Sequence, residues 1–197
     1  MTNCLICGVG GQGTILASRI LAMSAMLAGY SARTSETIGM AQRGGCVTSH
    51  IRYDRVVYSP MISVGQADLI IGLEPAEAVR NLPFLKENGL VIASTVVIRP
   101  VSGASQYEAG DMLQYLASRA ALITVDGQAV ALACATRQTL NIALIGAAIQ
   151  ANALGISEQI IRETLTGRFP QRLLDINLKA LALGMALARR ASGKART

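Results

Sequence analysis

The sequence predicts an α/β protein: a Rossmann-like three-layer sandwich with a mostly parallel sheet and a helical C-terminal third. Two observations carry this prediction. Short apolar segments alternate with helix-like segments over the first 125 residues, a pattern typical of a parallel sheet covered by helices. The first apolar segment, residues 3–8, also runs directly into a glycine-rich turn and a helix-like segment at residues 13–28, which is how a βαβ unit begins.

The other elements of the first half follow this opening in order. Gly29 is expected to end the first helix as its C-cap. A strand, a glycine-rich loop, a β-rich segment and, after a turn, a short strand are then expected at residues 30–35, 36–45, 46–53 and 56–58. A strongly apolar strand at residues 67–73 precedes a helix that begins at Glu74 and Pro75, with proline in its first turn.

The second half is expected to add two strands, at residues 90–94 and 121–125, on either side of a helix at residues 108–120. Helices then fill the rest of the chain, at residues 128–135, 139–154, 157–166 and 171–189. The final helix carries two apolar stripes, although one helix packed on one sheet needs only one. The second stripe therefore indicates either a subunit interface, including a homodimer of the isolated chain, or a helix wedged into its own core. We expect one domain over residues 1–190 and a basic, disordered tail at residues 191–197.

The composition restricts the class of protein. The 197 residues are enough for one domain with a substantial core, and only 15% of them are charged, well below the usual quarter. The longest apolar run, residues 142–149, is far shorter than the roughly 20 residues of a membrane span, so we expect a soluble subunit that buries surface against partners. The absence of a visible signal peptide favours the cytoplasm, where the four cysteines are reduced thiols. Nucleic-acid binding is not expected, because much of the +6 net charge lies in the tail and aromatic residues make up only 4%.

The glycine-rich turn is the first candidate site. Gly8, Gly10 and Gly13 occupy the three positions of a Gly-x-Gly-x-x-Gly match, and Gly11 and Gln12 complete the turn. In a dinucleotide fold the three glycines allow the turn, a close backbone approach to a phosphate, and close packing of helix on strand. The N-terminus of the following helix attracts anions. The turn therefore either binds a cofactor through a phosphate group or only packs the helix tightly on the sheet.

Glu36 suggests an alternative function, NAD binding. It lies 23 residues beyond Gly13, close to the spacing of about 20 residues at which a Rossmann NAD site places its ribose-binding acid. On this hypothesis the chain is a self-sufficient NAD(P)-binding oxidoreductase, and its proton donor would have to be His50 or Tyr53. Otherwise Glu36 is an ordinary glutamate of a surface loop.

No catalytic residue and no metal site is expected in this chain. Cys4 and Cys7 form a C-x-x-C pair, but on a strand they point to opposite faces and cannot bind one metal ion. Adding Cys46 and Cys134 gives no iron–sulfur pattern. His50, the only histidine, has no acid or nucleophile placed to complete a triad. The chain is therefore predicted to supply binding surface, not the chemistry itself.

A second glycine cluster lies at residues 39–45, where Gly44 and Gly45 follow Gln42 and Arg43. Two adjacent glycines give the backbone freedom, and the arginine adds one fork-shaped cation. This combination suits contact with a carboxylate, a phosphate or an acidic loop of a partner. An ordinary flexible loop explains the cluster equally well.

These motifs together resemble a known family. The segments at residues 8–13, 29–30, 34–36, 39–45, 58–60 and 67–68 are similar to the gamma-type subunit of 2-oxoacid:ferredoxin oxidoreductases. The Met-Ala-Gln-Arg-Gly-Gly version of the second cluster is most similar to the beta subunit of indolepyruvate ferredoxin oxidoreductases, and residues 177–180 with Gly184 resemble the final helix of that subunit. Cys46 departs from the pattern, where a smaller residue such as serine is expected.

The resemblance implies a multi-subunit enzyme that converts an aryl 2-oxo acid, coenzyme A and oxidised ferredoxin into an acyl-CoA, carbon dioxide and reduced ferredoxin. It implies that this chain holds no cofactor tightly. Thiamine diphosphate and the iron–sulfur clusters would belong to a large partner subunit, through which ferredoxin is reached indirectly, and in some relatives the gamma-type domain helps to hold coenzyme A. By the same resemblance, Gly10, Gly11, Gln12 and Gly13 form the turn at the helix N-terminus. Glu36, Gln42, Arg43, Gly44 and Gly45 would form a loop that faces substrate or partner, and the isolated chain would be inactive.

Overall fold

The sheet has six strands in the order β2-β3-β1-β4-β5-β6. The computed structural model describes residues 1–39, 44–98 and 107–194, with side chains as far as residue 189. Strand β1 is parallel to β4, β4 to β5 and β5 to β6, whereas β3 is antiparallel to both β1 and β2, which confirms a mostly parallel sheet. The strands are β1 (Thr2–Val9), β2 (Ser31–Ile38), β3 (Cys46–Asp54), β4 (Ala67–Gly72), β5 (Leu85–Ser94) and β6 (Ala121–Val125).

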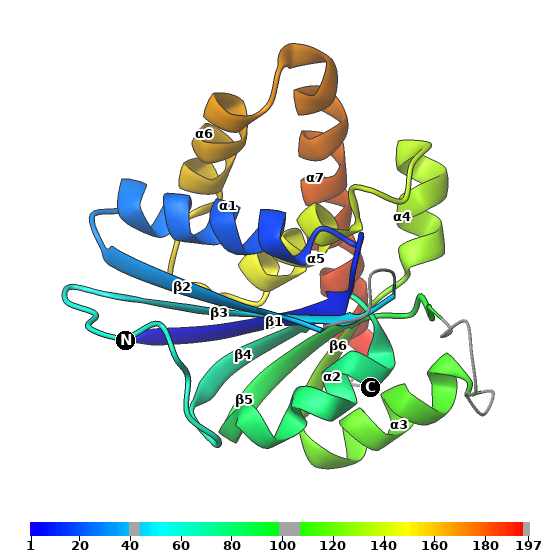
Figure 1. Ribbon diagram of the computed structural model, residues 1–197. Coiled ribbons are helices and arrows are strands. Elements are labelled where there is room, and N and C mark those ends of the chain that lie inside the picture. The colour runs from blue at the N-terminus through cyan, green and yellow to red at the C-terminus, as the bar shows by residue number, and fades with distance from the viewer. Residues whose placement is uncertain (40–43, 99–106, 195–197) are drawn as a thin grey trace.

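Helices cover both faces of this sheet, so the predicted three layers are present (Figure 1). The helices on one face are α1 (Thr14–Leu27), α4 (Gly127–Cys134), α5 (Leu140–Gln150), α6 (Glu158–Arg168) and α7 (Gln171–Lys194). The opposite face carries α2 (Pro75–Asn81), the short 3-10 helix η1 (Leu82–Phe84) and α3 (Ala109–Arg119). Within the described residues, no helix is long and apolar enough to cross a membrane.

Two apolar cores follow from the alternation of side chains along the central strands. Cys4 and Ile6 of β1 belong to the larger core, under α1 and the C-terminal helices, whereas Leu5 and Cys7 belong to the smaller core under α2 and α3. Because both faces are buried, the central strands are almost continuously apolar, as expected for parallel strands covered by helices. The opposite directions of Cys4 and Cys7 confirm that this pair cannot bind one metal ion.

The C-terminal helices pack closely through two glycines. Helix α5 is buried along most of its length and is crossed by α7. A Cβ atom on Gly184 would lie 1.8 Å from the carbonyl oxygen of Ala143, and one on Gly146 would lie 2.1 Å from that of Leu181. Much of the second apolar stripe of α7 packs on the larger core, namely Ile176, Leu183 and Leu187, which supports the interpretation of a helix wedged into its own core.

Several boundaries differ from the predictions. Helix α7 continues to Lys194, so residues 191–194 of the expected disordered tail are helical, and α5 ends at Gln150 and not at residue 154. Residues 56–58 form no strand. The connection that follows them is held by Arg52, whose Nη1 donates to the carbonyl oxygens of Ser59 and Met61, each at 3.0 Å. Strand β5 begins at Leu85, five residues early, with an irregular register where Asn88 adopts a positive φ of 63°. Strand β2 continues to Ile38, so residues 36–38 are strand and not loop.

Candidate functional site

The candidate site lies at the carboxyl ends of β1 and β4. From β1 the chain passes to α1 on one face of the sheet, and from β4 it passes to α2 on the other (Figure 1). Neighbouring parallel strands whose helices leave to opposite faces create a crevice, and α/β folds bind their ligands at such points. The glycine turn lies on one side of this point, and Leu73 and Glu74 lie on the other.

Two positions of the glycine turn strongly favour glycine. Gly11 and Gly13 have φ angles of 94° and 85°, in the left-handed region that side chains rarely adopt. At Gly13 a Cβ atom would also lie 2.5 Å from Nδ2 of Asn141. The turn is thus shaped for close packing, and its outer side at Gly11 is open, because no atom lies within 4 Å of the point that a Cβ atom would occupy there.

Gln12 points back into the protein instead of toward a ligand. Its Oε1 accepts a hydrogen bond from the backbone N–H of Val9 at 2.7 Å, and its Nε2 donates to the carbonyl oxygen of Leu73 at 3.0 Å. The side chain therefore links the turn after β1 to the end of β4. Of the predicted cofactor-binding residues, Gln12, Gly8 and Gly13 have a structural environment: Gly8 is buried beside Gln12 and Leu73, and Gly13 packs on Asn141. Only Gly10 and Gly11 are exposed.

The structure brings the end of the second glycine cluster against this turn. The N–H of Gly10 donates to the carbonyl oxygen of Gly45 at 2.9 Å, and a Cβ on Gly10 would lie 3.6 Å from the same oxygen. Gly44 precedes it with a φ of 73°. Gln42 and Arg43 lie outside the described residues. The two clusters that the sequence singled out are therefore neighbours, although about 30 residues separate them.

A cavity of about 260 Å³ opens at the turn. Apart from Thr14, its lining residues carry apolar side chains or are glycines, and the N–H of Gly10 is already bonded to Gly45. The first N–H groups of a helix have no partner within the helix, and no acidic side chain lies in the first turn of α1. Such a surface suits an anion. It is lined by Val9, Gly10, Gly11, Gly13, Thr14, Ile15 and Val47.

Glu36 is not placed as the NAD hypothesis requires. It lies within β2, and β3 separates β2 from β1, so Glu36 is two strands, roughly 10 Å, from the strand that carries the glycine turn. In a Rossmann sheet the second strand is the direct neighbour of the first. The exposed carboxylate instead receives a long contact from Oγ of Ser18, at 3.5 Å. The expected loop position of Glu36 is wrong, because the strand extends past it.

The two proton donors of that hypothesis are structural residues. Nδ1 of His50 accepts a hydrogen bond from the N–H of Ile62 at 3.2 Å, and burial lowers the pKa of its imidazole. The hydroxyl of Tyr53 donates to the carbonyl oxygen of Leu154 at 2.6 Å, and burial raises its pKa well above the usual range. Tyr53 pairs with Thr2, at the opposite end of β1 from the glycine turn. Neither residue can serve a ligand bound at the turn.

Sequence reasoning missed Asn141, the second residue of α5. Its Nδ2 donates to the carbonyl oxygen of Gly13 at 3.1 Å, and its Oδ1 accepts from the N–H of Ile142 at 2.8 Å. The amide thereby ties the start of α5 to the start of α1. The signal in the sequence was a polar residue, only 1% exposed here, at the entrance of the longest apolar run.

A buried acidic pair behind the crevice was also missed. Oε2 of Glu74 accepts from the N–H of Glu77 at 2.9 Å, and its Oε1 accepts from the hydroxyl of Tyr107. Burial raises the pKa of Glu77, against which Arg80 acts in the opposite direction. Because Glu74 caps α2, this pair has a structural explanation. No three histidine, cysteine or acidic side chains in the described part of the chain are grouped as metal ligands.

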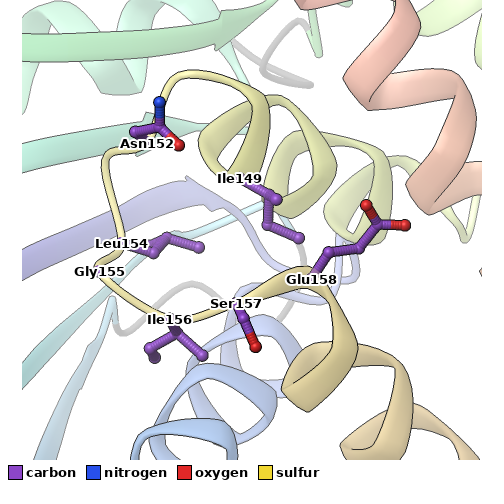
Figure 2. A pocket seen from close by; sticks show the side chains of 7 residues that line it. All are labelled: Ile149, Asn152, Leu154, Gly155, Ile156, Ser157 and Glu158. Carbon is purple, nitrogen blue, oxygen red and sulfur yellow. The ribbon is translucent and has the colours of Figure 1, made fainter.

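A second cavity, of about 220 Å³, lies on the connection between α5 and α6 (Figure 2). Two of its polar side chains already have partners. Oγ of Ser157 accepts from the N–H of Ile160, and Glu158 is paired with Arg162 at 2.7 Å. The loop also receives the hydroxyl of Tyr53, so it belongs to the end of the sheet away from the glycine turn. These contacts favour a structural role for the loop over a ligand site.

Comparison with known proteins gives consistent results. The family model of pyruvate ferredoxin/flavodoxin oxidoreductase matches residues 3–187. A chain from Thermococcus kodakarensis named indolepyruvate oxidoreductase subunit IorB is 34% identical, over 97% of this chain and 98% of its own length. The solved gamma subunit of a keto/oxoacid ferredoxin oxidoreductase from Geobacter sulfurreducens has a TM-score of 0.74 at 21% identity, and covers 97% of this chain and 100% of its own. A 2-oxoglutarate:ferredoxin oxidoreductase from Magnetococcus marinus, solved with 2-oxoglutarate, coenzyme A and succinyl-CoA, matches with a TM-score of 0.72 at 19% identity over 96% of this chain and 31% of that one.

Proposed function

Since the chain belongs to the pyruvate ferredoxin/flavodoxin oxidoreductase family, we propose that it is the small subunit of a thiamine-diphosphate-dependent 2-oxoacid:ferredoxin oxidoreductase. The complex would convert a 2-oxo acid, coenzyme A and oxidised ferredoxin into an acyl-CoA, carbon dioxide and reduced ferredoxin. An aryl pyruvate such as indolepyruvate is the proposed substrate. The observation that carries this proposal is the 34% identity, over nearly the full length of both chains, to a subunit named for indolepyruvate oxidation.

The size of a related chain supports the proposal that this protein is one subunit of a larger enzyme. A domain of this fold accounts for 31% of the single Magnetococcus marinus chain, so there it is one part of a longer polypeptide. Here the corresponding remainder would be a separate, larger partner. That partner would carry thiamine diphosphate and the iron–sulfur clusters, and it would pass electrons to ferredoxin. The small subunit would contribute binding surface at the edge of the shared active site, in the cytoplasm.

Coenzyme A is the ligand that the glycine turn fits best. Its phosphates are anions, and the cavity at Gly10, Gly11 and Gly13 lies at the N-terminus of α1, whose first N–H groups have no partner within the helix. Coenzyme A supplies the thiol that accepts the acyl group. The residues of this chain would hold its phosphate end and exclude water there, whereas Gly44 and Gly45 would shape the adjoining wall.

The first experiment is a pull-down of the native protein from an anaerobic cell extract, followed by an absorption spectrum and by thiamine and iron assays. We expect a brown complex that contains a large partner, thiamine diphosphate and iron. Activity with indolepyruvate, phenylpyruvate and pyruvate then ranks the substrates. A colourless protein without partner would overturn the proposal, and NAD(H) titration with Glu36→Ala as a control would then test the remaining alternative.

Arg43 is proposed to contact an anionic group of substrate, coenzyme A or partner, since it directly precedes the glycine pair that reaches the turn. Arg43→Ala should raise the KM for the 2-oxo acid or coenzyme A, or weaken assembly of the complex. Arg33→Ala, which removes an exposed arginine from β2, is the matched control and should change neither. Unchanged Michaelis constants and assembly in Arg43→Ala would remove Arg43 from the site.

A further inference from the structure

The connection between β3 and β4, residues 55–66, exposes apolar side chains that the protein does not bury. The side chain of Tyr58 is 94% exposed, more than any other large hydrophobic side chain in the described part of the chain. Single exposed apolar residues are ordinary, but several on one short segment indicate a surface for contact with another molecule. The loop surface consists of four such side chains, each at least half exposed: Val56, Tyr58, Met61 and Val64.

The connection is held in place by hydrogen bonds. Arg52 Nη1 donates to two of its backbone carbonyl oxygens, and Nδ1 of His50 accepts from the N–H of Ile62. A surface that is already fixed loses little conformational freedom when it binds a partner. The connection also has apolar side chains that point inward and are only 3% exposed, so it is anchored on one side and apolar on the other; these are Val57 and Ile62.

The loop surface lies at the opposite end of the sheet from the glycine turn. Tyr53, the last residue but one of β3, pairs with Thr2 at the start of β1, and the connection continues from there beside the N-terminus, at the left of Figure 1. The glycine turn follows Val9, at the other end of β1. Because β1 has eight residues, the two ends are roughly 25 Å apart. A contact made here is therefore separate from the candidate site.

The charges at this end of the sheet favour a partner with acidic groups. The carboxylates of Asp54 and Asp68 are already paired, with the N-terminal amine and with a lysine of β5. Arg33 and Arg55 are exposed, and neither forms a salt bridge with a described residue. At this end of the described chain they outnumber one exposed carboxylate without a salt bridge, that of Glu87. Two copies of the surface would bring like charges together, which is unfavourable, so a different polypeptide fits better than a second copy.

We propose that the loop surface is a second docking surface for the larger subunit, separate from the contact at the glycine turn. Tyr58 would be its central side chain, and carboxylates of the larger subunit would face Arg55. Tyrosine, methionine and arginine are the residue types enriched in protein interfaces. In the Magnetococcus marinus chain this fold covers 31% of the length, so a longer remainder is available there to pack around it. The identity of the partner rests on the proposed function.

The test measures binding of the full-length chain to the larger subunit captured in the pull-down, by calorimetric titration under anaerobic conditions. Tyr58→Asp removes the central aromatic side chain and places a carboxylate against an acidic partner, so its Kd should weaken by about tenfold or more. Arg55→Glu should weaken the Kd as well, and the difference from the unmodified chain should shrink as salt is added. Both side chains are exposed, so neither change should lower the Tm of the isolated chain.

Tyr115→Asp is the matched control. Tyr115 is also an exposed tyrosine, but it lies on α3, which packs on β6 at the far edge of the sheet from β2. The control should bind the larger subunit with unchanged Kd. When the small subunit is saturating, the complex with Tyr58→Asp should keep the KM values for the 2-oxo acid and coenzyme A, because the loop surface does not reach the glycine turn. A changed KM would place the loop at the active site and overturn the separate surface.

Two further results would overturn the proposal. One is a Tyr58→Asp variant that binds the larger subunit as tightly as the unmodified chain. The other is an isolated chain that sediments as a dimer and becomes monomeric in Tyr58→Asp while its Kd for the larger subunit stays the same, because the surface would then bind a second copy.

Failure of this inference is distinguishable from failure of the proposed function. An unmodified chain that binds no larger subunit refutes the proposed function, and the loop surface with it. An unmodified chain and a Tyr58→Asp variant that bind equally well keep the proposed function and refute the loop surface alone.

Discussion

Replacement of Gly184 by alanine tests the packing that fixes the C-terminal helices. The new Cβ would lie 1.8 Å from the carbonyl oxygen of Ala143, about 1.6 Å less than the 3.4 Å at which ordinary contact begins. Helix α5 cannot move away freely, because it is buried beneath α7 and against the sheet. Overpacking of this kind costs about 1–3 kcal/mol or more, whereas glycine to alanine in a helix returns about 1 kcal/mol.

We therefore expect Gly184→Ala to lose about 2 kcal/mol of unfolding free energy, and its Tm to fall by about 4–8 °C in a chain of this length. Thermal and urea unfolding followed by circular dichroism measure both quantities. Gly167→Ala on α6 is the control, because nothing lies within 4 Å of its Cβ position, and it should raise the Tm slightly. Equal behaviour of the two variants would refute the close α5–α7 packing.

Three further predictions concern the interior. Gln12→Ala loses the hydrogen bonds to Val9 and Leu73 and should cost about 1–3 kcal/mol in urea unfolding, whereas exposed Gln138→Ala should cost nothing. The pKa of His50 is lowered in the folded protein, so the unfolded chain binds a proton at this imidazole more readily, and the free energy of unfolding should fall as the pH drops below about 6.5. His50→Gln should flatten the plot of unfolding free energy against pH between about pH 7.5 and 5. An unchanged slope in this variant contradicts the assignment. Burial raises the pKa of the Cys4 and Cys7 thiols, so these residues should not react with iodoacetamide in the folded protein. Mass spectrometry should find only partly exposed Cys46 modified in the folded protein, and all four cysteines modified in urea.

Local features were predictable from the sequence because their causes are local. The glycine turn, the helix after it and the left-handed Gly29 at its end each depend on neighbours within a few residues, and the structure has all three. The proline in the first turn of α2 likewise places the start of that helix correctly. The apolar segment at residues 3–8 was predicted to open the sheet, and it lies in β1, whose side chains enter both cores.

The arrangement of the strands could not be predicted in the same way. The position of β3 between β1 and β2 depends on pairing between distant segments, and it decides where Glu36 lies relative to the glycine turn. The contact between Asn141 and Gly13 spans 128 residues, so no local pattern indicates it. The connection after residues 56–58 likewise depends on residues of β3, because Arg52 bonds to Ser59 and His50 accepts from the N–H of Ile62.

The central position of β1 has a consequence for how the chain folds during synthesis. The first strand to be made pairs with β3, which ends at Asp54, and with β4, which ends at Gly72. Both edges of the mostly apolar strand β1 can therefore be paired only after about seventy residues have been synthesised, and pairing over such separations slows folding. During that interval its edges can pair with other chains. Expression at lower temperature, or with a chaperone that binds apolar strands, should therefore raise the yield of folded protein.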